Sequence, residues 1–240
     1  MSHIMVPFAN GKGGVGKTTL ACSYAAARAR EGVDVLLADI NEQQRTALAW
    51  SEVRNHNGHL PKLRVEVMPA WQAMEQAGRC DVLVIDAPGW TDRSTLALAR
   101  RSTFMVIPTG PNPTYELAPT VRLLHGLKAE GVEAWRMGVV LSRFSEDETI
   151  RGQEEDLARA YLKEAGYAAL EGCLRNSPIY GSALAEGLGL TEVEGDASLV
   201  KEAAFVLASI EKGVQSADRR HARILEQTTG KIRERGGRDR

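Results

Sequence analysis

The sequence is poor in aromatic residues and in cysteine, and it lacks any long apolar run. Aromatic side chains make up 5% of the 240 residues, and the cysteines are Cys22, Cys80 and Cys173. Their wide spacing, without a C-x-x-C pair, argues against a disulfide framework or a zinc site and is typical of a reducing cytoplasm. No run approaches eighteen apolar residues, so we expect neither a membrane span nor a secretory signal peptide.

Net charge is also missing. The 30 Lys and Arg residues nearly balance the 31 Asp and Glu residues, which leaves a formal charge of −1. This balance excludes a globally basic nucleic-acid-binding protein but permits a local basic patch. Because 43% of the residues are hydrophobic and 25% are charged, the chain can bury one substantial core, and a single α/β domain is predicted.

What is present is a phosphate-binding motif. The stretch Gly11–Thr19 reads GKGGVGKTT and matches G-x-x-x-x-G-K-[ST], between an expected buried strand at Ile4–Ala9 and an expected helix over Leu20–Arg30. Glycines let backbone N–H groups turn inward around an anion, and the helix that begins near Lys17 adds its positive end. Lys17 is predicted to reach the β- and γ-phosphates, and the Thr18 hydroxyl to bind Mg²⁺. The expected nucleotide-binding residues of this loop are Gly11, Lys12, Gly13, Gly14, Val15, Gly16, Lys17, Thr18 and Thr19.

One residue of the loop, Lys12, is not required for cradling phosphate within one subunit. With Lys12 included, the loop resembles the deviant Walker A motif K-G-G-x-G-K-[ST]-T of the ParA/MinD family of ATPases. In that family the extra lysine reaches across a dimer interface to the partner's nucleotide. The resemblance therefore implies a homodimer that sandwiches ATP. The segment Arg175–Gly189 also resembles the end of small ParA proteins, including the plasmid-type ParF group.

Two further apolar runs end in an acid, which places a carboxylate at the edge of a parallel sheet where ligands bind. Val33–Ile40 delivers Asp39, and Asp81–Asp86 has the form of a Walker B strand. After Asp86, the backbone N–H of Gly89 is a candidate sensor of the γ-phosphate. A structural alternative for Asp86 is a helix N-cap. The candidate metal ligands are therefore Thr18, Asp39 and Asp86.

The resembled family ends its second strand in D-x-D, and this sequence departs from that pattern. Asn41 stands where the family has the aspartate that positions and polarises the attacking water. An amide accepts a hydrogen bond but cannot take a proton, so slow hydrolysis is expected. The resemblance makes Lys12, Asp39 and Asn41 the candidate catalytic residues.

The rest of the chain continues a strand–helix alternation. A loop that contains Gly89–Arg93 is a candidate nucleotide-dependent switch. Arg143 follows another buried strand where the family places a loop close to the base, so it either contacts adenine or is a solvated arginine. We expect strands at Leu63–Met68, Thr103–Pro108, Met137–Leu141 and Tyr167–Leu174, and helices at Gln43–Asn55, Thr114–Glu130, Glu148–Ala165 and Asp196–Ile210.

The C-terminal end changes composition. Within residues 214–240, eight Arg and Lys residues stand against four acids, and few large apolar residues remain. We therefore expect an ATPase domain over residues 1–213, followed by a basic tail over 214–240 that is mobile or only transiently helical. A basic arm on nucleic acid and a solvated tail are both open, whereas the few apolar residues disfavour a stable membrane anchor.

These features together predict a doubly wound, mostly parallel α/β sheet with helices on both faces, as in P-loop NTPases. The resemblance implies an ATP- and Mg²⁺-dependent homodimer that binds DNA non-specifically, is cytoplasmic and nucleoid-associated, and segregates or positions a plasmid, chromosome or protein cargo. It also implies a ParB-like or cargo-adaptor partner. Three alternatives stay open: a MinD-like membrane-associated division regulator, an ATP-dependent small-molecule ligase or phosphotransferase, and an iron-protein reductase, which the cysteine positions disfavour.

Overall fold

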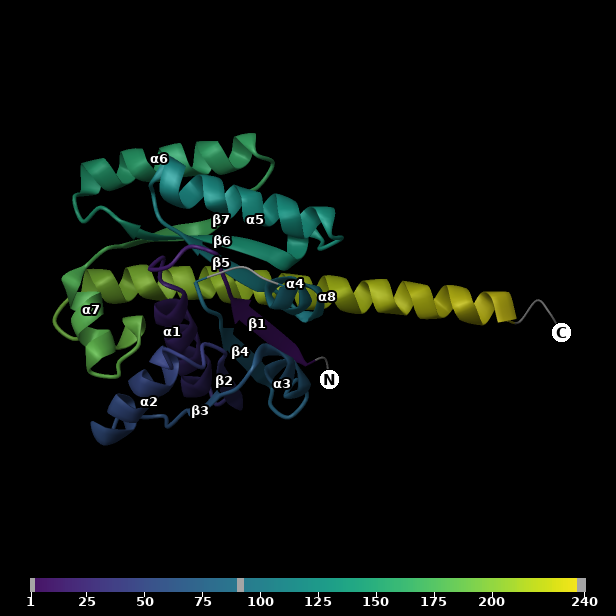
Figure 1. The fold of residues 1–240 in the computed structure, drawn as a ribbon, viewed down its shortest axis with the longest axis horizontal. Coiled ribbons are helices and arrows are strands. Elements are labelled where there is room, and N and C mark those ends of the chain that lie inside the picture. Colours follow the sequence, from purple (N-terminus) through teal and green to yellow (C-terminus); the bar gives the residue numbers. More distant parts are fainter. Residues whose placement is uncertain (1–2, 90–92, 237–240) are drawn as a thin grey trace.

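Seven parallel strands form one sheet, in the order β3-β2-β4-β1-β5-β6-β7 (Figure 1). The computed structural model describes residues 3–89 and 93–236. The strands are β1 (Ile4–Phe8), β2 (Val35–Asp39), β3 (Arg64–Val67), β4 (Val82–Asp86), β5 (Met105–Thr109), β6 (Met137–Phe144) and β7 (Ala169–Arg175). Four of them, β1, β2, β4 and β5, are buried on both faces apart from the first residue of β1, which is why they read as continuous apolar runs.

The strand order places β1 at the centre of the sheet. It pairs in parallel with β4 on one side and β5 on the other, while the chain passes from β1 to β2 through the first helix. The carboxyl ends of β1, β2 and β4 therefore meet at the point where the winding of the sheet reverses, which is where open α/β sheets bind ligands. The predicted doubly wound fold is confirmed.

Helices cover both faces and form two cores. On one face α1, α2, α7 and α8 pack around Val6, Phe8 and Leu37, and on the other α3, α4, α5 and α6 pack around Met5, Leu36 and Ile85. The helices are α1 (Lys17–Arg30), α2 (Thr46–His56), α3 (Ala70–Glu75), α4 (Arg93–Arg101), α5 (Ala118–Ala129), α6 (Glu148–Glu164), α7 (Pro178–Ala185) and α8 (Ala197–Gly236). Short helical turns are η1 (Pro113–Leu117, a π-helix), η2 (Ala134–Arg136) and η3 (Leu190–Glu192).

Several expected boundaries differ from the structure. The helix expected from Gln43 begins at Thr46, because side-chain hydrogen bonds of Asp39 and Asn41 hold the preceding residues in a turn. The helix expected from Thr114 is divided into η1 and α5. The short helices α3 and α4 were not predicted. In the expected switch loop Gly89–Arg93, residues 90–92 lie outside the described part of the chain.

The largest difference concerns the C-terminal helix. We expected it to close the domain near Ile210, yet α8 runs on to Gly236 and projects well past the sheet (Figure 1). The helix continues through the expected boundary, and Gly213 lies within it. A Cβ at Gly213 would lie 2.7 Å from Phe104 Cζ, so this glycine permits close helix–sheet packing. Val214 and Ala217 are buried beyond it, and the core therefore includes part of the expected tail.

Candidate functional site: a nucleotide-binding cavity

The loop between β1 and α1 has the backbone shape that its glycines predict. Gly14 and Gly16 have φ angles of 76° and 91°, in the left-handed region that favours glycine. Gly16 caps the start of α1, and a Cβ there would lie 2.8 Å from Ser142 Oγ. Gly16 is thus required by both its conformation and its neighbour. The loop and the N-terminus of α1 together present backbone N–H groups to an anion.

Lys17 lies at the first position of α1 and is largely buried. Its Nζ donates to the backbone oxygen of Lys12 at 2.8 Å, which folds the side chain back over the loop. Burial lowers the pKa of the Lys17 ammonium, and the charge of Asp86 opposes that shift. The ammonium is therefore placed at the centre of the phosphate-binding loop, as the motif predicts.

Thr18 and Asp86 form the part of the site that suits a divalent cation. The Thr18 hydroxyl donates to Asp86 Oδ2 at 2.7 Å, while the buried Oδ1 of Asp86 has no partner among the described residues. Burial raises the pKa of the Asp86 carboxyl to about 7; the charge of Asp39 adds to the rise, and the Thr18 hydrogen bond and Lys17 oppose it. An orphaned buried carboxylate oxygen beside a hydroxyl fits Mg²⁺, an oxygen-seeking ion. Such an ion, held by Thr18 and Asp86, would neutralise phosphate charge on a bound nucleotide.

Asp39 is fully buried beside this pair but has a different set of contacts. Its Oδ1 accepts the backbone N–H of Asn41 at 3.0 Å, and its Oδ2 accepts that of Ala47 at 2.9 Å. The carboxylate thus caps the start of α2 and fixes the turn that carries Asn41. It is not among the side chains that line the cavity, so its predicted roles as metal ligand and catalytic residue stay predictions.

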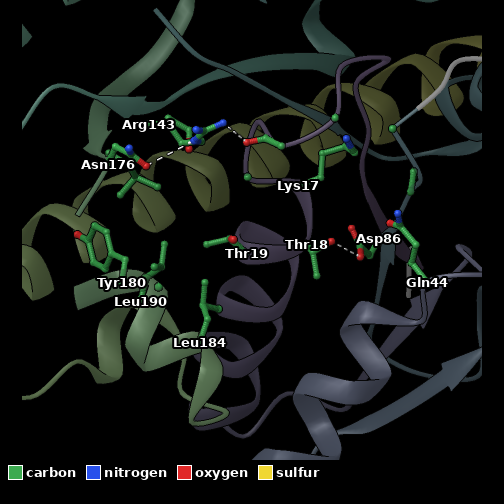
Figure 2. A pocket seen from close by; sticks show the side chains of 18 of the residues that line it. Lys17, Thr18, Thr19, Gln44, Asp86, Arg143, Asn176, Tyr180, Leu184 and Leu190 are labelled. Atoms are coloured by element: carbon green, nitrogen blue, oxygen red, sulfur yellow. Dashed lines mark hydrogen bonds between the residues drawn. The ribbon is translucent and has the colours of Figure 1, made fainter. Parts of the chain in front are cut away.

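Asn41 does line the cavity, and a neighbour orients its amide. Its Nδ2 donates to Gln44 Oε1 at 2.8 Å, and its Oδ1 accepts the backbone N–H of Gln44 at 3.2 Å. Gln44 itself lines the same side of the cavity (Figure 2). The two amides form a fixed polar pair near the phosphate loop, where an attacking water would need hydrogen-bond acceptors.

Gly89 closes the phosphate side of the cavity. A Cβ on this residue would lie 3.1 Å from the Cα of Gly13 and 3.6 Å from Lys17 Nζ. The chain after β4 therefore passes directly over the phosphate-binding loop, which is the placement expected of a γ-phosphate sensor. Any larger residue at Gly89 would push into that loop.

The cavity has a volume of about 600 Å³ and extends from the phosphate loop to the C-terminal third of the chain. Figure 2 shows Arg143 and Asn176 on the side away from Asp86, with Tyr180, Leu184 and Leu190 below them. Arg143, with a φ of 66°, directs its guanidinium to the oxygen of Gly14 and lies 3.5 Å from Asn176 Oδ1. Contact of Arg143 with a base stays a prediction, but its placement at the cavity wall is consistent with it.

Sequence reasoning missed most of this second wall. The missed residues of this wall are Ser142, Asn176, Ser177, Tyr180, Gly181, Leu184 and Leu190. Gln44, on the opposite side of the cavity, was missed as well. The resemblance of Arg175–Gly189 to small ParA proteins pointed to this segment without indicating which side chains face the nucleotide. For Gln44 the available signal was its place three residues after Asn41 at a helix start.

The chemistry of this cavity can be compared with known proteins. Residues 6–190 match the CobQ/CobB/MinD/ParA nucleotide binding domain. The chain belongs to this family. It is 31% identical to the maintenance of carboxysome distribution protein A of Gloeobacter kilaueensis over 203 residues, which cover 84% of this chain and 90% of that protein.

Solved structures of the MinD/ParA type share the fold. The septum site-determining protein MinD of Pyrococcus horikoshii, complexed with Mg-ADP, superposes with a TM-score of 0.67 at 16% identity, over 88% of this chain and 97% of that one. An ATP complex of a Cyanothece McdA variant gives a TM-score of 0.66 at 16% identity, over 88% and 98% of the two chains. The protein is thus a ParA/MinD-family ATPase with a deviant Walker A loop.

Lys12, the additional lysine of the loop, is not among the residues that line the cavity. The residue is exposed, and within the described part of the chain its ammonium has no hydrogen-bond or ion-pair partner. Its backbone N–H donates to the Asn10 side chain, and its backbone oxygen accepts from Lys17 Nζ.

None of the helices within residues 3–89 and 93–236 has the length and apolar character needed to cross a bilayer.

Proposed function

We propose that this ATPase forms an ATP-dependent sandwich homodimer on DNA and positions a protein assembly through an adaptor partner. The observation that carries the proposal is the 31% identity to a carboxysome distribution protein over 90% of that protein's length. A relationship of that extent includes the nucleotide site as well as the surfaces around it. It favours a protein cargo over the plasmid or chromosome that the wider ParA group moves.

The dimer is supported by the geometry of the two loop lysines. Lys17 is buried and lines the cavity, whereas Lys12, in the same loop, is exposed and does not line it. A cation held at the rim of one cavity is suited to meet phosphate charge in a facing copy. ATP and Mg²⁺ then join the two subunits, and hydrolysis releases them.

Substitution of each lysine tests whether Lys17 binds the nucleotide of its own subunit and Lys12 that of the partner. Lys17→Ala should abolish ATP binding, because the buried ammonium faces its own nucleotide. Lys12→Ala should keep monomer binding within about threefold but prevent dimerisation, since it removes a charge that meets phosphate only in the dimer. Light scattering with a non-hydrolysable ATP analogue measures the dimer, and fluorescence titration measures nucleotide binding. Lys128→Ala, on the exposed face of α5, is the control.

A Lys12→Ala variant that dimerises like the wild type would show that the cross-subunit role is wrong. A wild-type protein that stays monomeric at saturating ATP analogue would overturn the sandwich dimer itself. Binding to anionic vesicles rather than DNA in the ATP state would favour the division-regulator alternative. Turnover that depends on a small-molecule acceptor would favour the ligase or phosphotransferase.

The cargo can be identified with the nucleotide-trapped dimer. Proximity labelling from the ATP-analogue-bound protein, with Lys17→Ala as the matched control, should recover an adaptor that also stimulates hydrolysis when purified. If that adaptor binds components of a large protein assembly, the proposed cargo class is supported. If it binds a specific DNA site as a ParB-like protein does, the cargo is a plasmid or chromosome instead.

A further inference from the structure

A buried asparagine lies directly before the phosphate-binding loop, between β1 and Lys12. Asn10 is 1% exposed, and its amide makes three hydrogen bonds. The Nδ2 group donates to the backbone oxygen of Pro108 at 2.7 Å and to Thr120 Oγ1 at 2.9 Å. The Oδ1 atom accepts the backbone N–H of Lys12 at 3.0 Å. Each polar atom of this amide is therefore used, and rotating the amide would break all three bonds.

The amide connects the phosphate-binding loop to a distant segment of the chain. Thr120 is fully buried at the start of α5, and its hydroxyl lies 2.8 Å from the backbone oxygen of Glu116, to which it donates, and 3.0 Å from Thr109 Oγ1. Glu116 belongs to η1, the π-helical turn that precedes α5. A buried polar network that is fully satisfied holds its members in one arrangement.

Two side chains form hydrogen bonds with the backbone of Lys12. Its oxygen accepts from Lys17 Nζ at 2.8 Å, and its N–H donates to Asn10. Lys17 is the lysine that the motif predicts to bind phosphate, so the Lys12 oxygen shares its ammonium with any bound nucleotide. Asn10 does not line the cavity, so its hold on the Lys12 N–H involves no group that binds nucleotide.

We propose that Asn10 is a positioning residue for Lys12, which it ties to the start of α5 so that the lysine is presented in a fixed direction to the partner's nucleotide. The effect of Asn10 on dimerisation rests on the proposed sandwich dimer. The hydrogen bond by which Asn10 fixes the Lys12 backbone is present within each subunit. Asn10 does not line the cavity, so it acts through Lys12 and not on nucleotide directly.

The test uses three variants of the full chain. Asn10→Ala removes all three bonds. Thr120→Val replaces the hydroxyl that accepts from Asn10 with a methyl group of similar size, at a residue that does not line the cavity. Thr120→Ser keeps that hydroxyl and is the matched control. Thermal unfolding of each variant shows whether it is folded, and Thr120→Val keeps the test available if Asn10→Ala does not fold.

Two measurements separate the local hold from its consequence. In the ADP-bound monomer, exchange of the Lys12 amide hydrogen should be at least about tenfold faster in Asn10→Ala than in the wild type. With a non-hydrolysable ATP analogue, the dimer dissociation constant should rise at least about tenfold, while ADP affinity changes by less than about threefold. Thr120→Val should shift both quantities in the same direction by less, and Thr120→Ser should match the wild type.

An unchanged exchange rate of the Lys12 amide hydrogen in Asn10→Ala would overturn the inference. If the wild type dimerises, an unchanged dimer dissociation constant in Asn10→Ala would overturn it too. A parallel loss of ADP affinity and dimerisation would also overturn it, because Asn10 would then support the whole phosphate loop. If the wild type never dimerises, the proposed function fails, and the exchange rate of Lys12 still decides the role of Asn10.

Discussion

At the scale of single residues, Asn41 is the cavity residue for which we predict the largest effect on hydrolysis. Its side chain is nearly buried, faces the cavity and is oriented by Gln44. The pair offers hydrogen-bond acceptors to a water but no group that takes a proton. A positioned acid–base group contributes on the order of 10²–10⁴ in rate, so hydrolysis should be slow while ATP binding stays tight.

Asn41→Asp should raise single-turnover hydrolysis at least about tenfold, because a carboxylate supplies both negative charge and a proton acceptor. The Gln44 amide can rotate to donate to the new carboxylate, which keeps the geometry. Quenched-flow measurement with saturating Mg²⁺-ATP and DNA gives the rate, and Glu42→Gln, on an exposed neighbour, is the control. Equal rates for wild type and Asn41→Asp would mean that water is activated elsewhere, with Asp39 the nearest candidate.

The polar and charged residues of the site also show what could be predicted from the sequence. Lys17, Thr18 and Asp86 follow motifs in which local strand, loop and helix order places each side chain, and the structure brings them together as expected. Asn176 and Tyr180 reach the same cavity from about 160 residues away in the sequence. Their orientation depends on how β6, β7 and α7 pack, which no local pattern in the chain encodes.

At the scale of elements, a buried arginine joins α2 to η3, the turn whose Leu190 lines the cavity. Arg54 is fully buried and donates to both carboxylate oxygens of Glu192 at 2.7 and 2.9 Å, as well as to three backbone oxygens. From sequence, an arginine on a helix is expected to face solvent. This arginine is instead covered because η3 and the chain after α7 fold over it, a contact that only the tertiary fold creates.

The same pair gives stability a specific pH dependence. Burial alone would raise the pKa of Glu192, but the hydrogen bonds from Arg54 and the Gly189 N–H and the charges of Arg54 and Arg30 outweigh it and lower the pKa. A carboxyl whose folded pKa is depressed stabilises the protein above its unfolded pKa, here 4.5, and this contribution is lost as pH falls through the folded value.

Wild-type stability should therefore decline between about pH 5 and pH 3, and Glu192→Gln should show a shallower decline in that window. At pH 7 the variant should be less stable by about 3 kcal/mol, since Arg54 keeps its charge in a buried site. Urea unfolding at a series of pH values measures both effects. Glu194→Gln, on an exposed residue two positions away, is the control, and an identical pH slope in Glu192→Gln would contradict the role of this pair.

A second prediction at this scale compares Gly213 in α8, which packs against an aromatic ring, with Gly126 in α5, which has open space beside it. Gly→Ala in a helix usually stabilises by about 1 kcal/mol. Gly126→Ala in α5 should do so, because nothing lies within 4 Å of the new Cβ. Gly213→Ala should instead destabilise by about 1–3 kcal/mol, because its Cβ would meet the ring of Phe104. Chemical denaturation compares the two, and stabilisation of Gly213→Ala would show that α8 packs differently on Phe104.

At the scale of the whole molecule, the length of α8 changes how a C-terminal truncation should be designed. Val214 and Ala217 are buried, and the Arg220 guanidinium lies 5.0 Å from the ring centroid of Trp135. A deletion that begins at residue 214 therefore damages the core, whereas one that begins at residue 222 spares these three residues. The sequence did not reveal this distinction, because the change in composition from residue 214 onward suggested a boundary there.

Deletion of residues 222–240 should leave the free energy of unfolding unchanged and weaken sequence-independent DNA binding if the basic segment contributes. The salt dependence of binding should also become less steep, since a protein that neutralises fewer phosphates releases fewer counterions. Fluorescence anisotropy at several salt concentrations measures this for the ATP-analogue-bound protein. Deletion of 214–240 is the comparison and should lower stability. Unchanged affinity and salt slope after the shorter deletion would place the DNA surface on the folded body.

The continuation of α8 past Ala217, the last buried residue within residues 3–227, also sets a physical length. From Asp218 to Gly236 the helix contains nineteen residues, which at 1.5 Å per residue form a rod of about 28 Å. A helical rod transmits orientation as well as distance, unlike a random coil of the same composition. A group bound at the end of α8 would therefore be held at a set distance from the ATPase body. In a two-fold dimer, two such helices would project in symmetry-related directions.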